Sequence, residues 1–139
     1  MNRTLRKSLT GAALVAAIGL GGAGVASAEQ IGPVTVTVPP GGRACVVTSG
    51  RATYKVRADG SAPNATGSLV QWSMANAFDG VSYQQIPSQT LNGNYYGGEL
   101  NSSFYPQYFP SYWKFCVRNL GTTTNVKATL TLKTDANAF

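Results

Sequence analysis

The sequence predicts an all-β fold, namely an antiparallel β-sandwich of about seven strands that carries one disulfide. Three observations lead to this prediction. Short segments alternate apolar and polar residues with the two-residue period of half-buried strands. Turn residues separate these segments about every 8–12 residues, a spacing typical of sandwiches. Beyond residue 28, no segment has the periodicity of an amphipathic helix.

Seven segments carry the strand pattern. In the first, Val34, Val36 and Val38 alternate with threonines, and a Pro-Pro-Gly-Gly turn follows. In the last, apolar residues from Val126 to Leu132 alternate with lysine and threonine, which is the clearest strand pattern of the chain. We expect strands at residues 34–38, 43–48, 52–58, 69–78, 81–86, 111–118 and 126–133.

The dipeptide Asp79-Gly80 lies between the fourth and fifth of these segments. Asp-Gly between two apolar runs is the strongest short-range signal for a β-hairpin, because both residues tolerate the positive φ angles of a tight turn. We therefore expect residues 69–78 and 81–86 to pair as a hairpin.

The two cysteines, Cys45 and Cys116, are expected to form a disulfide, because residues 1–28 have the pattern of an export signal and an even cysteine count in an exported chain indicates one. The bond would close a loop of 71 residues and stabilise the fold by about 4 kcal/mol in the chain-entropy model. Paired cysteines so far apart loosely resemble an immunoglobulin-like arrangement. Lys114, however, stands where that family has a tyrosine, and Trp72 lies beyond the usual spacing after the first cysteine.

The strand around Cys116 allows two orientations, because side chains alternate between the faces of a strand. Trp113 and Phe115 share one face with Val117, and Cys116 shares the other face with its charged neighbours. We favour the orientation with the aromatics in the core and the disulfide on the outer face. In the alternative, Cys116 faces the core and Trp113 and Phe115 become candidate binding residues; a bulge would mix the two.

Residues 1–28 have the pattern of a cleaved signal peptide: a basic start, an apolar stretch and the small-residue sequence Ala-Ser-Ala before Glu29. The stretch is too short and too rich in alanine and glycine for a membrane anchor. Residues 29–139 would then form one β-sandwich domain of a secreted, extracellular bacterial protein. Removing the signal lowers the net charge from +6 to +3, so we expect neither nucleic-acid binding nor membrane insertion.

The sequence contains no histidine, which removes the commonest general base and the usual nucleophile–histidine arrangements. Of its five acids, Asp59 and Glu99 are the only pair that could serve glycoside hydrolysis. We therefore expect a protein that is not an enzyme and that uses no cofactor and no metal. A calcium site built mainly from backbone carbonyls stays open at this point.

Aromatic residues concentrate between residues 95 and 115, which hold nine of the fourteen in the chain. Tyrosine combines a large contact area with a hydroxyl group and low side-chain entropy, which suits recognition surfaces. The alternative is a long loop whose aromatics fold down as a lid on the core. The candidate binding residues are Tyr95, Tyr96, Tyr105, Tyr108, Tyr112 and Trp113.

These observations predict a secreted, non-enzymatic binding module. Its partner would be another secreted or surface protein, in which case the module could be an adaptor subunit of a larger assembly, or a surface polysaccharide. The strand at 34–38 is a second candidate, as an edge that pairs with a partner strand. Two alternatives are a protease inhibitor that presents Arg43 or Arg51, and a small hydrolase of unusual type that uses Asp59 or Glu99.

Overall fold

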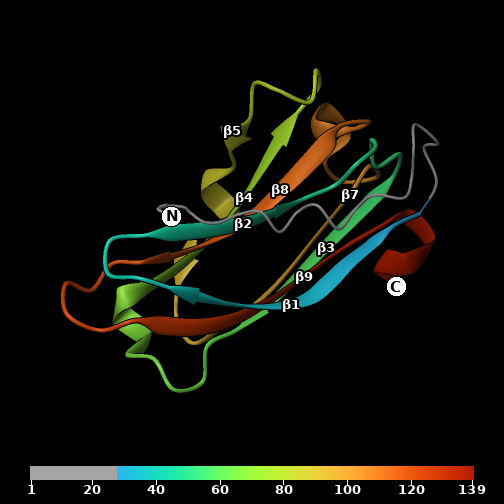
Figure 1. The fold of residues 1–139 in the computed structure, drawn as a ribbon. Helices are drawn as coiled ribbons and strands as arrows, with labels where there is room; N and C mark the ends of the chain where they lie inside the picture. Colours follow the sequence, from blue (N-terminus) through green and yellow to red (C-terminus); the bar gives the residue numbers. More distant parts are fainter. Residues whose placement is uncertain (1–27) are drawn as a thin grey trace.

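The computed structural model describes residues 28–139, which form two antiparallel sheets packed face to face (Figure 1). The expected signal peptide lies, except for Ala28, outside the described residues. The four-stranded sheet has the order β1 (Gln30–Val38), β9 (Val126–Thr134), β3 (Lys55–Ser61) and β7 (Tyr95–Asn101). The five-stranded sheet has the order β2 (Arg43–Val47), β8 (Tyr112–Asn119), β4 (Val70–Ala77) and β5 (Gln84–Gln85), and β6 (Leu91–Asn92) also pairs with β4.

The chain passes back and forth between the two sheets as it proceeds from β1 to β4 and again from β7 to β9. This order, in which the strand pairs wrap around a common core, is that of a jelly roll. Four short 3-10 turns complete the described part: η2 (Gly67–Leu69), η3 (Pro87–Gln89), η4 (Pro106–Tyr108) and η5 (Asp135–Ala138). The prediction of an all-β antiparallel sandwich with one disulfide is confirmed.

The core lies between the sheets and is built from the apolar positions of the alternating strands. Trp72 of β4 stacks on Phe115 of β8, with ring centroids 5.7 Å apart. From the opposite sheet, Leu100, Leu130 and Leu132 are fully buried. The alternation in β1 and β9 that the sequence shows therefore corresponds to inward and outward faces.

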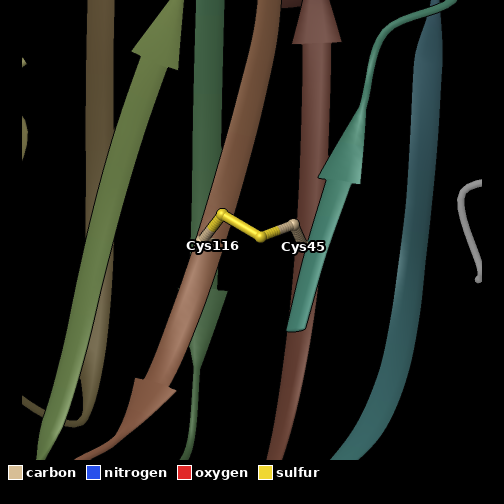
Figure 2. Close-up of a disulfide and its surroundings, with 2 residues drawn as sticks. All are labelled: Cys45 and Cys116. Atoms are coloured by element: carbon tan, nitrogen blue, oxygen red, sulfur yellow. A yellow bond between two sulfur atoms is a disulfide. The ribbon is translucent and has the colours of Figure 1, made fainter. Parts of the chain in front are cut away.

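The disulfide joins neighbouring strands of one sheet, because Cys45 of β2 lies directly opposite Cys116 of β8 (Figure 2). Trp113 and Phe115 point into the core, which confirms the favoured orientation of this strand and leaves the disulfide on the outer face. An immunoglobulin disulfide instead connects the two sheets. The likeness to that arrangement thus extends to the sandwich and not to its cross-link.

Three predicted segments differ from the structure. Residues 81–86 form a loop and only two strand residues, because the side chain of Asp79 holds a longer turn than the expected tight one. The third strand begins at Lys55 and not at residue 52, because the carboxylate of Asp135 takes up the backbone N–H groups of residues 53–55. Residues 95–101, which are outside the seven expected strands, form strand β7 beside β3.

Strand β1 is an edge strand, since its one partner within the described sheet is β9. A register shift between Ile31 and Val34 and the proline at position 33 interrupt this edge. Bulges and prolines are devices that weaken pairing with further strands. The predicted pairing of β1 with a partner strand stays a prediction.

Candidate functional site

Three loops and the C-terminal turn meet at one end of the sandwich, on the right of Figure 1. They are the β2–β3 loop (48–54), the β4–β5 loop (78–83), the β7–β8 loop (102–111) and η5. The pairing of Ala77 with Tyr112 and the bridge between Ala52 and Ser111 hold them together. We call this region the aromatic end, because it carries Tyr54, Phe78, Tyr83, Phe104, Tyr105, Tyr108, Phe109, Tyr112 and Phe139.

The β7–β8 loop folds down over the core. Tyr105 stacks on Tyr108 at 6.2 Å between ring centroids, and Tyr108 meets the edge of Trp113 at 6.3 Å. Phe109 contacts Trp113 from another side, at 5.5 Å. The hydroxyl of Ser111 donates to the backbone carbonyl of Tyr108 and closes the turn. Part of this loop therefore covers the core, as in the alternative prediction that its aromatic side chains fold down as a lid. The outer surface of the loop remains accessible.

The six predicted binding residues separate into three groups. Tyr105, Tyr108 and Tyr112 come together at the aromatic end and are half-buried. Trp113 and Tyr96 lie in the core, at 0% and 5% exposure, because strand alternation turns both side chains inward. Their burial corrects the prediction that these two form part of a surface. Tyr95 is 65% exposed but pairs with Ser61, at the opposite end of the sandwich.

The hydroxyl of Tyr96 is also committed within the fold. It donates to the side-chain oxygen of Gln89 at 2.9 Å and lies 3.1 Å from the backbone oxygen of the same residue. Burial raises the pKa of Tyr96 to about 12. This residue thus anchors the segment around η3 to the core.

Arg51 links two loops of the aromatic end. Its Nε and Nη2 atoms donate to the backbone carbonyl of Phe78 at 3.3 and 3.0 Å. The guanidinium lies over the ring of Tyr112, 5.1 Å from the centroid, in cation–π geometry. An inhibitor that presented Arg51 to a protease would have to give up both contacts.

Asp79 shapes the β4–β5 loop. One carboxylate oxygen accepts the backbone N–H groups of Val81 and Ser82 at 2.8 and 2.7 Å, and the other accepts the Ser82 hydroxyl at 2.9 Å. These hydrogen bonds lower the pKa of Asp79 from 3.8 to about 2, because they favour the charged form. The turn leaves Phe78 and Val81 exposed by 54% and 80%.

A pocket of about 390 Å³ opens between this loop and the turn η4. The residues that line it comprise three with carboxamide side chains, a serine, an aspartate and two aromatic residues. The sequence did not indicate the pocket, because its residues come from two separate stretches, 76–84 and 107–108, with no shared motif. The pocket is lined by Asn76, Phe78, Asp79, Ser82, Gln84, Gln107 and Tyr108.

The two acids considered for hydrolysis lie elsewhere, on the outer face of the four-stranded sheet. Arg57 binds both of them, with its Nε 3.0 Å from Asp59 and its Nη1 3.5 Å from Glu99. The hydrogen bond with Asp59 is the main cause of the raised pKa of Arg57. Lys55 adds a second ion pair to Glu99 at 3.2 Å. Both carboxylates are therefore members of an ion-pair network.

Two further observations concern the described residues 28–139. Among them, no group of three or more His, Cys, Asp or Glu side chains is placed to hold a metal ion. None of the helices in this part of the chain has the length and apolar character that crossing a membrane would require.

Comparisons with known proteins give a likeness of fold. No protein-family model and no curated protein matches the sequence. Among solved structures, the fold is similar to the crystal structure of the Yersinia pseudotuberculosis-derived mitogen, YPM. The TM-score is 0.55 at 12% sequence identity, over 81% of this chain and 89% of the mitogen chain. At this identity, the two proteins share an architecture.

Proposed function

We propose that the protein is a non-enzymatic extracellular binding module whose aromatic end docks on a protein partner. The observation that carries the proposal is the exposure of three large apolar side chains on two neighbouring loops. Phe104 is 78% exposed on the β7–β8 loop, and Phe78 and Val81 stand out from the β4–β5 loop. Burying exposed apolar side chains against a partner removes them from water, which favours binding.

The loops that present these side chains are held in place from below. Asp79 fixes the β4–β5 turn, and Arg51 ties that turn to the β2–β3 loop. Tyr108 holds the β7–β8 loop on the core through Trp113. A surface that is already ordered loses less conformational entropy on binding, so more of the contact energy appears as affinity.

Two further features support an extracellular binding role. The Cys45–Cys116 disulfide suits an oxidising compartment. The solved structure of similar fold is named as a mitogen, and we take that name as support for a binding role of this chain. The ion pairs of Asp59 and Glu99 support the non-enzymatic part of the proposal.

Affinity capture from culture fluid and cell-envelope extracts of the producing organism tests the proposal. We expect the tagged protein to retain a protein partner, and Phe104→Ala combined with Val81→Ser to weaken that interaction by tenfold or more, on the order of a single hot spot. These two side chains are better probes than Tyr105 or Tyr108, because those rings pack on the core.

Tyr95→Ala is the matched control, since it removes an exposed aromatic from the opposite end. It should leave capture unchanged. Docking through the aromatic end would be contradicted if the Phe104 and Val81 changes left capture unchanged. It would also be contradicted if the Tyr95 change weakened capture equally.

A further inference from the structure

We infer that the pocket between the β4–β5 loop and η4 binds one neutral sugar unit. This inference deepens the proposed function, because it names a ligand for the same end of the sandwich. It rests on the composition of the pocket wall and not on the exposed residues Phe104 and Val81.

The size and the aromatic part of the wall suit a sugar ring. The volume of about 390 Å³ falls in the range of small-molecule sites, which is about 300–1,000 Å³. Two of the lining residues are aromatic, Phe78 of the β4–β5 loop and Tyr108 of η4. One face of a sugar ring carries apolar C–H groups, which pack on the electron-rich face of an aromatic ring.

The polar part of the wall matches hydroxyl groups. Asn76, Gln84 and Gln107 each bring a carboxamide with two N–H donors and an acceptor oxygen, and Ser82 brings a hydroxyl. A sugar hydroxyl both donates and accepts, so it pairs with either end of a carboxamide. Three carboxamides on one small wall therefore favour a ligand that is rich in hydroxyl groups.

The charge of the wall selects a neutral ligand. Its one ionised group is the carboxylate of Asp79, which repels anions, and its lining contains no lysine or arginine. The nearby guanidinium of Arg51 is engaged with the carbonyl of Phe78. The low pKa of Asp79 keeps this carboxylate charged at neutral pH.

Three of the residues that line the pocket make contacts outside it. Tyr108 packs between Tyr105 and Trp113, and the backbone carbonyl of Phe78 accepts hydrogen bonds from Arg51. Asn76 is buried, with its Nδ2 3.5 Å from the hydroxyl of Ser111. A preformed wall of this kind positions donors and acceptors before the ligand arrives.

Nuclear magnetic resonance titration of the 15N-labelled protein tests the inference. The probes are the methyl glycosides of glucose, mannose, galactose and N-acetylglucosamine. We expect at least one probe to shift the carboxamide signals of Asn76, Gln84 and Gln107 in a saturable way. Glucuronic acid should bind more weakly than the corresponding neutral sugar, because of Asp79.

Gln84→Ala and Gln107→Ala should each weaken sugar binding by roughly tenfold, as expected for the loss of a hydrogen bond. Gln85→Ala is the matched control. It is the neighbour of Gln84 in β5 and is also exposed, but it is outside the pocket and donates to Thr90. The control should bind sugar as the unchanged protein does.

Three results would overturn the inference: no saturable shift with any of the four probes, shifts that map outside the pocket, or equal binding by all three glutamine variants. Removing glycans from a captured protein partner, compared with titrating a purified surface polysaccharide, identifies the source of the sugar.

The proposed function and this inference can fail independently of each other. If the Phe104 and Val81 variant loses capture of the partner but the protein binds no sugar, the sugar site alone is refuted. If the protein binds sugar but the Phe104 and Val81 variant still captures the partner, docking through the aromatic end alone is refuted.

Discussion

Gly60 of β3 lies directly against the indole ring of Trp72, which reaches across the core from β4 in the facing sheet. A Cβ atom at position 60 would come within 2.3 Å of Cζ3 of Trp72. The tryptophan is fully buried and donates from its Nε1 to the carbonyl of Gly93 at 2.8 Å. The ring therefore occupies space that any other residue at position 60 would fill.

Gly60→Ala is expected to lower the free energy of unfolding by about 1–3 kcal/mol, because overpacking forces the core to shift. Urea denaturation followed by tryptophan fluorescence measures the change. Gly97→Ala on β7 is the control, since its Cβ would lie 3.8 Å from the nearest atom, a carboxylate oxygen of Asp59. Equal losses in the two variants would show that the Trp72 contact is not the cause.

Asp135 is expected to be a strong stabiliser of the aromatic end. Its buried carboxylate accepts backbone N–H groups from Thr53, Tyr54 and Lys55, the closest at 2.8 Å. Asp135→Ala removes all three acceptor contacts and should lower the free energy of unfolding by about 3 kcal/mol. Asp135→Asn keeps one acceptor oxygen and tolerates the positive φ of 52° at this position, so it should lose less. Thermal unfolding of the two variants checks the order, and a larger loss in the Asn variant would contradict it.

The β4–β5 turn is expected to depend on pH through Asp79. Because the pKa of this carboxyl falls from 3.8 to about 2 on folding, its stabilising effect is complete above about pH 4. The effect is lost as the pH decreases through the folded-state value near 2. The amide chemical shifts of Val81 and Ser82 should titrate with that midpoint. Ser82→Ala removes one hydrogen bond and should raise the midpoint; a midpoint of 3.8 in the unchanged protein would contradict the role of the turn.

The Cys45–Cys116 disulfide is expected to stabilise the protein without shaping its core. It lies on the outer face, with a sequence separation of 71 residues. Replacing both cysteines by alanine should lower the free energy of unfolding by about 4 kcal/mol in the chain-entropy model. The near-ultraviolet circular dichroism of the folded variant should persist, because Trp113 and Phe115 keep their packing on the other face. Reduction of the unchanged protein should give a similar loss, and a loss near zero would contradict the prediction.

The chain found in culture fluid is expected to begin at Glu29. The carboxylate of Glu29 accepts the hydroxyl of Ser49 at 2.7 Å and the backbone N–H of Gly50 at 3.1 Å, and its own N–H donates to Thr134 at 2.9 Å. Cleavage before Glu29 preserves these contacts, whereas cleavage after it removes them. Intact-mass spectrometry of the secreted protein identifies the first residue. A chain that begins at Gln30 or later would contradict the prediction.

The order of residues was sufficient to predict the class of the fold and the inward faces of its most regular strands. Alternation with a period of two is a local property, so the inward positions of β9 and the pairing of two lone cysteines could be predicted from the order of residues. The order of the strands in the two sheets could not be predicted in this way, because it depends on which distant segments bury each other's apolar faces.

Tertiary structure decided the composition of the site. The tyrosines at 95 and 105 are near in sequence, yet β7 carries them to opposite ends of the sandwich. In contrast, Gln107 follows Gln84 by 23 residues and still shares one wall with Gln84 and Asn76, because the wrapping of the two sheets brings the β4–β5 and β7–β8 loops to the same end. The local pattern can state which face a side chain occupies, but only the packing of the sheets decides which side chains become neighbours.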